Sequence, residues 1–327
     1  MSIKLSIIIP VYNVERYVGE TLESVFETSA AVDEFEVIIV NDGTKDGSMD
    51  VVQQFSGCPN LKIVEHNNQG LSAARMNGVS VAQGEFVWFI DSDDWLVDDG
   101  VGRVLALIKD RPDVDVLMFP LQRIIEEDPS NNHLDYQFSG EASITGIEVM
   151  RDLKLYMWCA QRYVFKRSLM DSPWLFFPLG RLHEDEYFAP VLMCLANQVC
   201  VFDYPVYMHR IRNGSIMTTI DVRSSYDIVA VHKLLIRFME QKLPSSEWPW
   251  FRAHCLTQLE TSYSFNASNF ETSRFRRFAS REGLYVWKEW KTVYRDKSLR
   301  KKLGQLFYFL NPALRKKYSA LMSRSRK

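Results

Sequence analysis

Short apolar runs alternate with segments that repeat apolar residues every three to four positions through the first 120 residues. The runs predict buried strands, because few polar side chains interrupt them. The repeating segments predict amphipathic helices. We expect strands at 5–11, 35–40, 61–64, 86–90 and 114–119, and helices at 14–26, 49–55, 70–82 and 101–108. This alternation predicts an α/β fold built on a doubly wound, mostly parallel sheet with helices on both faces.

The pattern after residue 120 is less regular. We expect a strand at 201–207 and a polar loop at 208–219, and from about residue 224 onward the pattern is helical, including 229–239 and 251–263. The chain is therefore expected to have an α/β half, a middle part and a helical C-terminal region. Their expected bounds are 1–120, 121–220 and 221–327.

Two helices of the middle part have recognisable starts. Thr145 and Glu148 have the spacing of a capping box, which predicts a helix over 145–155. The acidic residues at 183–186 precede another helix, in which Pro190 is acceptable only within the first turn. The acidic cluster should therefore stand at or just before the start of that helix.

Polar side chains follow four of the predicted strands. One such loop would mean little, because Asn and Asp are ordinary turn residues. Right-handed crossovers, however, bring these loops together at one edge of the sheet, where α/β proteins bind ligands. Four of them favour a nucleotide pocket. The residues are Tyr12, Asn13 and Glu15, then Asp42, then His66, Asn67 and Asn68, and finally Asp91, Asp93 and Asp94.

The last of these loops places three carboxylates directly after an apolar strand. If the chain stays extended, Asp91 and Asp93 point the same way. Hard oxygen ligands on one side suit Mg²⁺ or Mn²⁺ held against substrate phosphates. The alternative is an acidic loop that only caps the next helix.

The composition indicates a globular protein of one large domain or two smaller ones. The 327 residues are 46% hydrophobic, which is enough for a sizeable core. Five scattered cysteines argue against a disulfide framework and fit a reducing compartment. We see neither a signal-peptide pattern nor an apolar run long enough to span a membrane. We therefore expect a cytoplasmic protein, soluble or peripheral.

The charge is unevenly distributed along the chain. The net charge is −2, but residues 274–327 hold 17 Lys and Arg against 3 Asp and Glu. Such a basic tail suggests an anionic partner surface, either membrane headgroups or nucleic acid. Apolar residues at helical spacing (Leu303, Leu306, Phe307 and Leu310) beside basic clusters favour a peripheral helix on the inner face of the membrane. The alternative is a solvated helix face that packs on the protein body.

Six motifs stand in the order seen in family 2 glycosyltransferases, and the resemblance covers roughly residues 3–218. The motifs are Ser6–Asn13, Val40–Ser48, Gly70–Gly78, Asp91–Asp94, His183–Asp185 and Tyr207–Ile216. The resemblance implies a GT-A fold and inverting transfer of a hexosyl or N-acetylhexosaminyl group from a nucleotide-sugar donor, with a UDP-sugar expected. It implies a Mg²⁺ or Mn²⁺ cofactor, a glycan or lipid-linked glycan as acceptor in surface polysaccharide synthesis, and no nucleic-acid partner.

The resemblance also implies a role for each matching residue. Asp42 would accept a hydrogen bond from a uracil-type base, and Asp93 would hold a metal that neutralises charge on the diphosphate. One departure is that Met76 follows Arg75, where the family usually has Asn. Arg75 could also be a surface arginine of an amphipathic helix. The expected donor-binding residues are Pro10, Tyr12, Glu15, Asp42, Arg75, Asp91, Ser92, Arg210 and Arg212.

On the acceptor side, Asp185 resembles the general base, with Glu184 and His183 beside it. Neighbouring carboxylates would raise the pKa of Asp185, whereas a helix N-terminus would lower it. The alternative is that these carboxylates only satisfy the helix terminus. Arg210 and Arg212, in this order of preference, resemble a loop that pairs with the diphosphate, and the alternative there is a solvated basic loop.

Two other functions compete with this interpretation. A sugar nucleotidyltransferase would need a Gly-rich basic phosphate loop near the N-terminus, whereas residues 10–17 contain no Gly and one Arg. A non-catalytic sugar-nucleotide-binding protein would not need Asp93 and Asp185, and both are present.

Overall fold

The computed structural model describes residues 3–136, 142–152, 158–212, 222–252 and 255. The chain divides into two compact units, residues 1–220 and 221–327. Every strand among the described residues belongs to the first unit. The predicted division at residue 120 stays a prediction.

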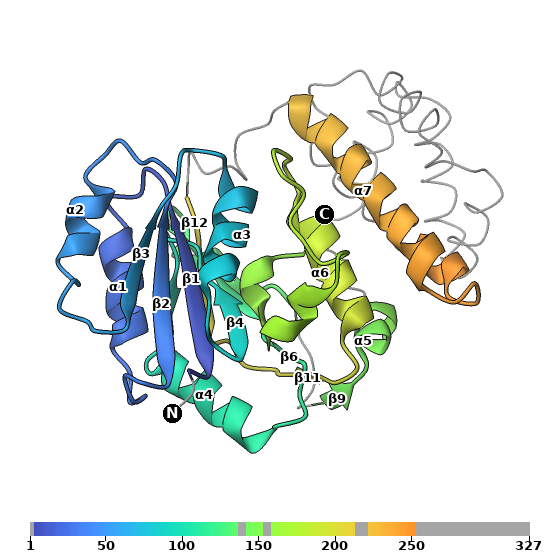
Figure 1. The fold of residues 1–327 in the computed structure, drawn as a ribbon, viewed down its shortest axis with the longest axis horizontal. Helices are drawn as coiled ribbons and strands as arrows, with labels where there is room; N and C mark the ends of the chain where they lie inside the picture. The colour runs from blue at the N-terminus through green and yellow to red at the C-terminus, as the bar shows by residue number, and fades with distance from the viewer. Residues whose placement is uncertain (1–2, 137–141, 153–157, 213–221, 253–254, 256–327) are drawn as a thin grey trace. The chain divides into compact units, whose positions relative to one another are not determined.

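An eight-stranded sheet forms the centre of the first unit (Figure 1). In spatial order its strands are β3 (Leu61–Glu65), β2 (Phe35–Asn41), β1 (Leu5–Val11), β4 (Phe86–Phe89), β10 (Tyr163–Lys166), β6 (Val116–Met118), β11 (Val199–Val201) and β9 (Ala142–Ile144). The first four strands are parallel, as are β6 and β11, whereas β10 and β9 run antiparallel to their neighbours. The predicted α/β sheet is confirmed.

A second sheet is formed by segments that follow strands of the large sheet along the chain. Its strands, in spatial order, are β5 (Trp95–Leu96), β12 (Tyr207–Ile211), β7 (Leu121–Ile125) and β8 (His133–Leu134). The predicted strand over 201–207 is therefore wrong, because residues 202–206 connect β11 to β12. The predicted loop is also wrong over 208–211. These polar residues form a strand because their backbone pairs with β7 on one side and β5 on the other.

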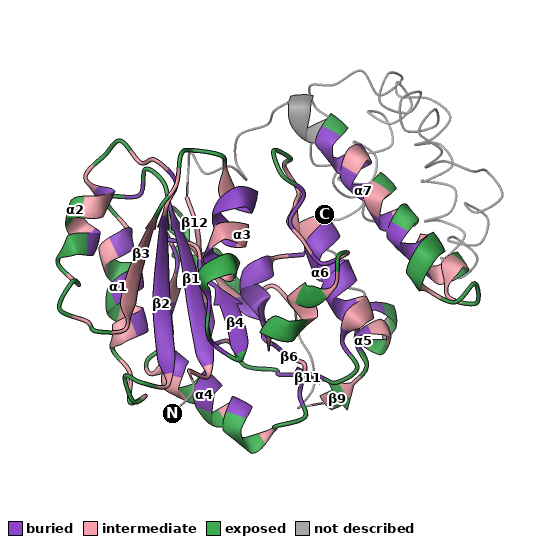
Figure 2. Ribbon diagram, viewed as in Figure 1, coloured by how far each residue is buried: buried purple, intermediate pink, exposed green. Residues whose placement is uncertain are grey.

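Helices cover both faces of the large sheet. Apolar residues of α1 (Val18–Phe26) and α4 (Gly100–Asp110) join one core cluster with β1 and β2. On the other face, α3 (Leu71–Val81) lies so close to β1 that a Cβ on Gly78 would be 2.3 Å from Cγ2 of Ile8. Figure 2 shows that the central strands are buried, whereas β3 at the sheet edge is only half-buried. The remaining helices of this unit are α2 (Ser48–Gln53), α5 (Gly146–Asp152) and α6 (Asp185–Leu195), with 3₁₀ turns at Pro129–Asn131, Ala160–Arg162 and Arg167–Asp171.

The two helix starts of the middle part are as predicted. The hydroxyl of Thr145 accepts from the Glu148 amide (3.3 Å), and the Glu148 carboxylate accepts from the Thr145 amide (2.8 Å). Helix α6 begins at Asp185, so the acidic cluster stands at its start. The expectation for Pro190 is wrong, because it lies inside α6 beyond the first turn. Buried apolar side chains on either side of Pro190 keep the helix packed despite the missing amide hydrogen.

In the second unit, α7 (Val222–Lys242) confirms the predicted helix over 229–239. It buries an apolar stripe formed by Ile228, Val229, Val231, Leu235, Phe238 and Met239. The basic tail and most of the predicted helix over 251–263 lie outside the described residues. Within the described part of the chain, no helix is long and apolar enough to cross a membrane.

Candidate active site

The carboxyl end of β1 carries the first donor-side residues. Pro10 is buried and lies past Ile8, the last β1 residue that pairs with β4, so its missing amide leaves no gap in that ladder. Tyr12 is 43% exposed. The Glu15 carboxylate accepts a hydrogen bond from the amide of Gly47 (3.0 Å), which ties the loop after β1 to the loop after β2. The loops after β1 and β2 are therefore held together at this edge of the sheet, where the ring of Tyr12 is exposed.

Asp42, at the end of β2, is buried and holds the loop that precedes α3. Its carboxylate accepts from the amides of Gln69 (2.8 Å) and Gly70 (2.9 Å) and lies 3.0 Å from Nδ1 of His66. Gly70 has a φ of +90°, a backbone conformation that favours glycine. Both carboxylate oxygens thus already accept hydrogen bonds within the protein. The contact of Asp42 with a base stays a prediction.

Arg75 gathers three carboxylates around one guanidinium. Its side chain is 1% exposed, so the alternative of a surface arginine is wrong. Nη1 contacts Asp185 (2.9 Å) and Glu184 (3.1 Å), and Nη2 contacts Asp91 (3.0 Å). The guanidinium carbon also lies 5.1 Å from the ring centre of Phe177. Residues from three separate motifs thus meet at a single buried cation.

The segment after β4 is a turn and not an extended strand. The amide of Asp94 donates to the carbonyl of Asp91 (3.1 Å), so the condition for Asp91 and Asp93 to point the same way is not met. Asp91 instead faces Arg75, and Asp93 faces Arg212. The two carboxylates thus serve different neighbours, although both lie in one loop.

Asp94 and Ser92 hold this turn in place through hydrogen bonds to neighbouring elements. Asp94 is buried, and its carboxylate accepts from the hydroxyl of Tyr207 (2.6 Å) and the amide of Arg210 (2.7 Å). The Ser92 carbonyl accepts from the hydroxyl of Thr21 (3.0 Å). Asp94 therefore anchors the turn to β12, and Ser92 anchors it to α1.

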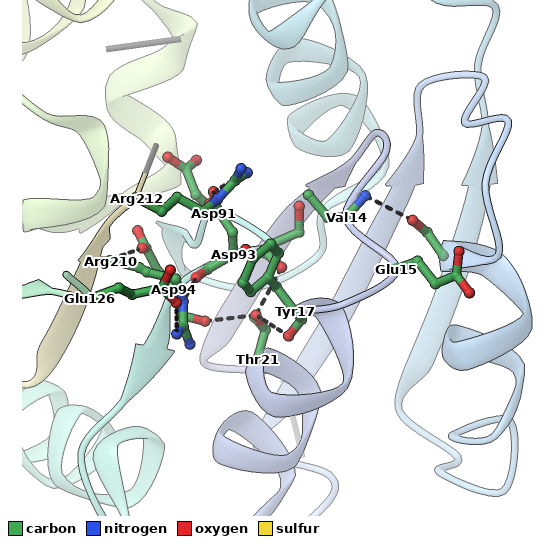
Figure 3. A network of polar contacts seen from close by, with 12 residues as sticks. Val14, Glu15, Tyr17, Thr21, Asp91, Asp93, Asp94, Glu126, Arg210 and Arg212 are labelled. Atoms are coloured by element: carbon green, nitrogen blue, oxygen red, sulfur yellow. Dashed lines mark hydrogen bonds and ion pairs between the residues drawn. The ribbon is translucent and has the colours of Figure 1, made fainter. Parts of the chain in front are cut away.

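Arg210 of β12 and Arg212, which directly follows this strand, are held differently (Figure 3). Arg210 forms ion pairs with Glu126 (2.8 Å) and Glu20, and its guanidinium carbon lies 4.4 Å from the ring centre of Trp95. Arg212 contacts Asp93 (2.8 Å). Arg210 is thus neutralised by two carboxylates, whereas Arg212 reaches the residue expected to hold a metal. This geometry favours Arg212 over Arg210 as the arginine available to a diphosphate.

The comparison with known protein families identifies the family of the chain and its class of reaction. The sequence model of the family "Glycosyl transferase family 2" matches residues 6–170, just over half of the chain. The chain belongs to glycosyl transferase family 2. This membership makes the protein a glycosyltransferase and decides against a sugar nucleotidyltransferase.

Individual relatives agree with this assignment. EpsH of Bacillus subtilis is 27% identical over 261 residues, which cover 75% of this chain and 71% of EpsH. The poly(ribitol-phosphate) beta-N-acetylglucosaminyltransferase TarS of Staphylococcus aureus is 27% identical over 236 residues, which cover 71% of this chain and 40% of TarS. The crystal structure of TarS 1–349 in complex with UDP-GlcNAc matches with a TM-score of 0.62 at 20% identity, covering 90% of this chain and 91% of that one. The expected GT-A fold is thereby confirmed.

Three half-buried carboxylates of the enzyme have raised pKa values. Burial, followed by the charge of Asp185, raises the pKa of Glu184 to about 7. Burial also raises the pKa of Asp185, and this effect outweighs the opposing charge of Arg75. Burial and the nearby Asp91 raise the pKa of Asp93. The pKa of the expected base is therefore shifted upward, toward neutral pH.

Two carboxylates of the loop after β4 have the oxygen chemistry that a divalent cation needs. No group of three or more His, Cys, Asp or Glu is arranged as a complete metal site among the described residues. Asp91 and Asp93 nevertheless offer hard oxygen atoms from one loop. On β12, burial lowers the pKa of His209 to about 4, which keeps its imidazole in the neutral form that ligates metals, and its Nδ1 is buried without a hydrogen-bond partner.

Several residues that shape the site were not predicted as site residues. Tyr207 bridges the Asp91 amide (3.1 Å) and the Asp94 carboxylate, and Gln161 donates to the Asp91 carboxylate. Tyr207 lies inside a recognised motif, Tyr207–Ile216, so the sequence could have indicated it as a site residue. No local pattern marks Gln161, because its role arises from tertiary contact alone. The predicted acceptor-side residue His183 has a φ of +64°, and it directly precedes the N-cap residue of α6.

Proposed function

We propose that the enzyme is an inverting glycosyltransferase that moves a sugar from a UDP-sugar to a hydroxyl of a glycan or lipid-linked glycan in surface polysaccharide synthesis. The relatives support this substrate class. TarS was crystallised with UDP-GlcNAc and is named for transfer to poly(ribitol-phosphate). GgaA of Bacillus subtilis, a minor teichoic acid biosynthesis protein, is 30% identical over 193 residues, which cover 58% of this chain and 43% of GgaA.

The observation that carries the proposal is the bridge formed by Arg75. Its two terminal nitrogens contact Asp185 (2.9 Å) and Asp91 (3.0 Å), so the expected base and the expected leaving-group side lie on either side of one guanidinium. Inversion needs this separation, because the acceptor oxygen attacks the anomeric carbon from the face opposite the diphosphate. A rigid, buried cation between the two carboxylates supports such a fixed arrangement.

Asp185 would act as the general base in this reaction. It would take the proton of the acceptor hydroxyl while the new carbon–oxygen bond forms and the bond to the diphosphate breaks. The raised pKa of Asp185 suits proton transfer, since a catalytic base works best with a pKa close to the operating pH. Such a base contributes about 10²- to 10⁴-fold in rate.

On the donor side, Pro10, Tyr12 and Asp42 would receive the nucleoside. Asp93, with Asp91 beside it, would hold Mg²⁺ or Mn²⁺. That cation, when bound, supplies charge neutralisation at the diphosphate. Arg212 would add a contact with phosphate oxygens, and its ion pair with Asp93 supports this role.

Substitution of the base separates the catalytic role from donor binding. Asp185→Asn should lower transfer by at least about 100-fold, because the amide cannot accept the proton. UDP in the presence of Mn²⁺ should still raise the melting temperature. The matched control is Asp110→Asn, at an exposed carboxylate at the end of α4, which should keep full activity. Loss of UDP binding in Asp185→Asn would contradict the proposed role.

The donor itself can be identified by a screen for metal-dependent hydrolysis across common nucleotide sugars. A UDP-sugar should be hydrolysed preferentially, and chelation of the metal should abolish the reaction. The anomeric configuration of the transferred sugar, followed by NMR, should invert. Retention of configuration, or equal hydrolysis of GDP- and dTDP-sugars, would contradict the proposal.

A further inference from the structure

The contact between Arg212 and Asp93 has the form expected of a replaceable cation site. Nη2 and Nε of Arg212 lie 2.8 and 3.1 Å from the same oxygen, Oδ2 of Asp93. The two side chains are 19% and 24% exposed, so both can be reached from solvent. The guanidinium carbon of Arg212 lies 4.7 Å from the ring centre of Tyr17, on which the planar group rests (Figure 3).

The neighbouring Arg210, in strand β12, has the contacts of a cation that is held in place. Arg210 pairs with two carboxylates and donates through Nε to the backbone carbonyl of Asp93 (2.8 Å). Among the described residues, the ion pair of Arg212 is to Asp93 alone. Arg212 can therefore leave its carboxylate by moving the end of its side chain, whereas release of Arg210 would break contacts to three chain segments.

The local charge explains why Asp93 carries a cation in the absence of donor. Asp91 and Asp94 stand in the same turn, and a third carboxylate left unpaired among them would be costly. A guanidinium and a divalent cation both satisfy such a group, and they would compete for the same oxygen. Arg also binds phosphate oxygens through the same planar fork.

We propose that Arg212 occupies the cation position on Asp93 until donor binds and then exchanges partners. Asp93 would then be free to hold a divalent cation, and the Arg212 guanidinium would turn to the donor diphosphate while it remains over the Tyr17 ring. This inference rests on the proposed function, in which Asp93 holds the metal.

The exchange has a thermodynamic consequence that can be measured without catalysis. The metal alone must displace Arg212, which then has no anionic partner. When a nucleoside diphosphate is present, the displaced Arg212 pairs with phosphate. Metal and nucleotide should therefore bind with positive cooperativity, and each should raise the affinity for the other by the same factor.

Arg212→Gln tests the exchange in the full-length chain, because it keeps hydrogen-bonding capacity and removes the charge. Mn²⁺ binding, followed by electron paramagnetic resonance without nucleotide, should become tighter by about tenfold when the competing ion pair is lost. UDP should bind about tenfold more weakly in the presence of Mn²⁺. The cooperativity between Mn²⁺ and UDP should shrink accordingly. Arg103→Gln, at an exposed arginine of α4, is the matched control and should leave all three quantities unchanged.

Two outcomes overturn the inference in different ways. If Arg212→Gln binds Mn²⁺ alone with wild-type affinity, no exchange occurs at Asp93, even if UDP binding weakens; the proposed function would then still stand. Asp93→Asn provides the separate check on that function. If Asp93→Asn binds Mn²⁺ as the wild type does, with and without UDP, then Asp93 does not hold the metal, and the proposed metal site and the exchange are both wrong.

Discussion

Glu184 is 13% exposed, and its neighbours include two other carboxylates and one arginine. Burial and the charge of Asp185 raise its pKa to about 7, above the ordinary value of 4.5. The folded chain therefore holds a proton on Glu184 between these two pH values, whereas the unfolded chain has lost it. Because the folded state binds more protons in this window, the free energy of unfolding falls as the pH rises through it.

Glu184→Gln should remove this pH dependence. Between pH 5 and pH 8 the wild type should lose on the order of 1–3 kcal/mol of stability relative to Glu184→Gln, because only the wild type has to ionise a buried group. Urea unfolding at both pH values, in buffer with chelator, measures the difference. Glu23→Gln, at an exposed position of α1, serves as the control and should follow the wild type. A parallel pH dependence in wild type and Glu184→Gln would contradict the raised pKa.

The residues of this cluster were predictable as motif members but not in their contacts. Arg75, Asp91 and Asp185 each belong to a recognised motif. A helical arginine on the surface and one buried among carboxylates can have the same local sequence. The sequence alone therefore could not exclude that Arg75 is a surface residue. The burial of Arg75 follows only when α3, the turn after β4 and the start of α6 are brought together.

At the scale of elements, α3 sets the position of Arg75 through its close contact with the sheet. Gly78, three residues further along this helix, faces Ile8 and Val40. Its missing side chain lets the helix axis approach the strands. Any change that lifts α3 from the sheet would also move Arg75 away from its carboxylates.

Gly78→Ala should therefore destabilise the protein, although alanine favours helices over glycine by about 1 kcal/mol. The added Cβ would lie 2.3 Å from Ile8 Cγ2 and 3.3 Å from Val40 Cγ2, so buried side chains or the helix must shift. Overpacking of this kind costs about 1–3 kcal/mol, which is at least as large as the gain in helix propensity. Urea unfolding measures the loss. Gly57→Ala, where nothing lies within 4 Å, should be neutral, and an equally neutral Gly78→Ala would refute the packing argument.

Elements were predictable where the apolar pattern alone determines them. The parallel strands β1, β2 and β4 are buried on both faces, and their runs were evident. Strand β12 was missed beyond its first residue, because its polar side chains Tyr207 and Arg210 contact Asp94 and Asp93, while its backbone pairs with neighbouring strands. A strand used as a scaffold for charged groups has the composition of a loop.

At the scale of the whole molecule, the change of pattern after residue 120 does not interrupt the sheet. Strands β10, β11 and β9, from the middle part, join the sheet formed by the strands of the α/β half, and β10 lies between β4 and β6. The sequence pattern could not indicate this, because the antiparallel strand β10 lies in a short segment of mixed character between two 3₁₀ turns. The order of the motifs carried the family assignment, and this order does not depend on such segments.

The charge division along the chain leads to a prediction for the whole molecule. Residues 274–327, which lie outside the described structure, hold 17 of the 39 Lys and Arg. If this tail binds an anionic membrane surface, each basic residue at the surface contributes about 1 kcal/mol. Replacing Arg300, Lys301 and Lys302 with Gln should then weaken binding to vesicles with anionic lipid by about 100-fold, as measured by cosedimentation.

The electrostatic origin of this binding has its own controls. Added salt should weaken it, because ions screen charges beyond about 10 Å at 0.1 M. Replacing the exposed residues Arg16, Lys45 and Arg103 of the first unit removes the same charge and should leave vesicle binding unchanged. Equal binding to neutral and anionic vesicles would show that the tail does not act through its charge. Its basic residues would then belong to a solvated face, and the acceptor would have to reach the active site without help from a membrane-bound tail.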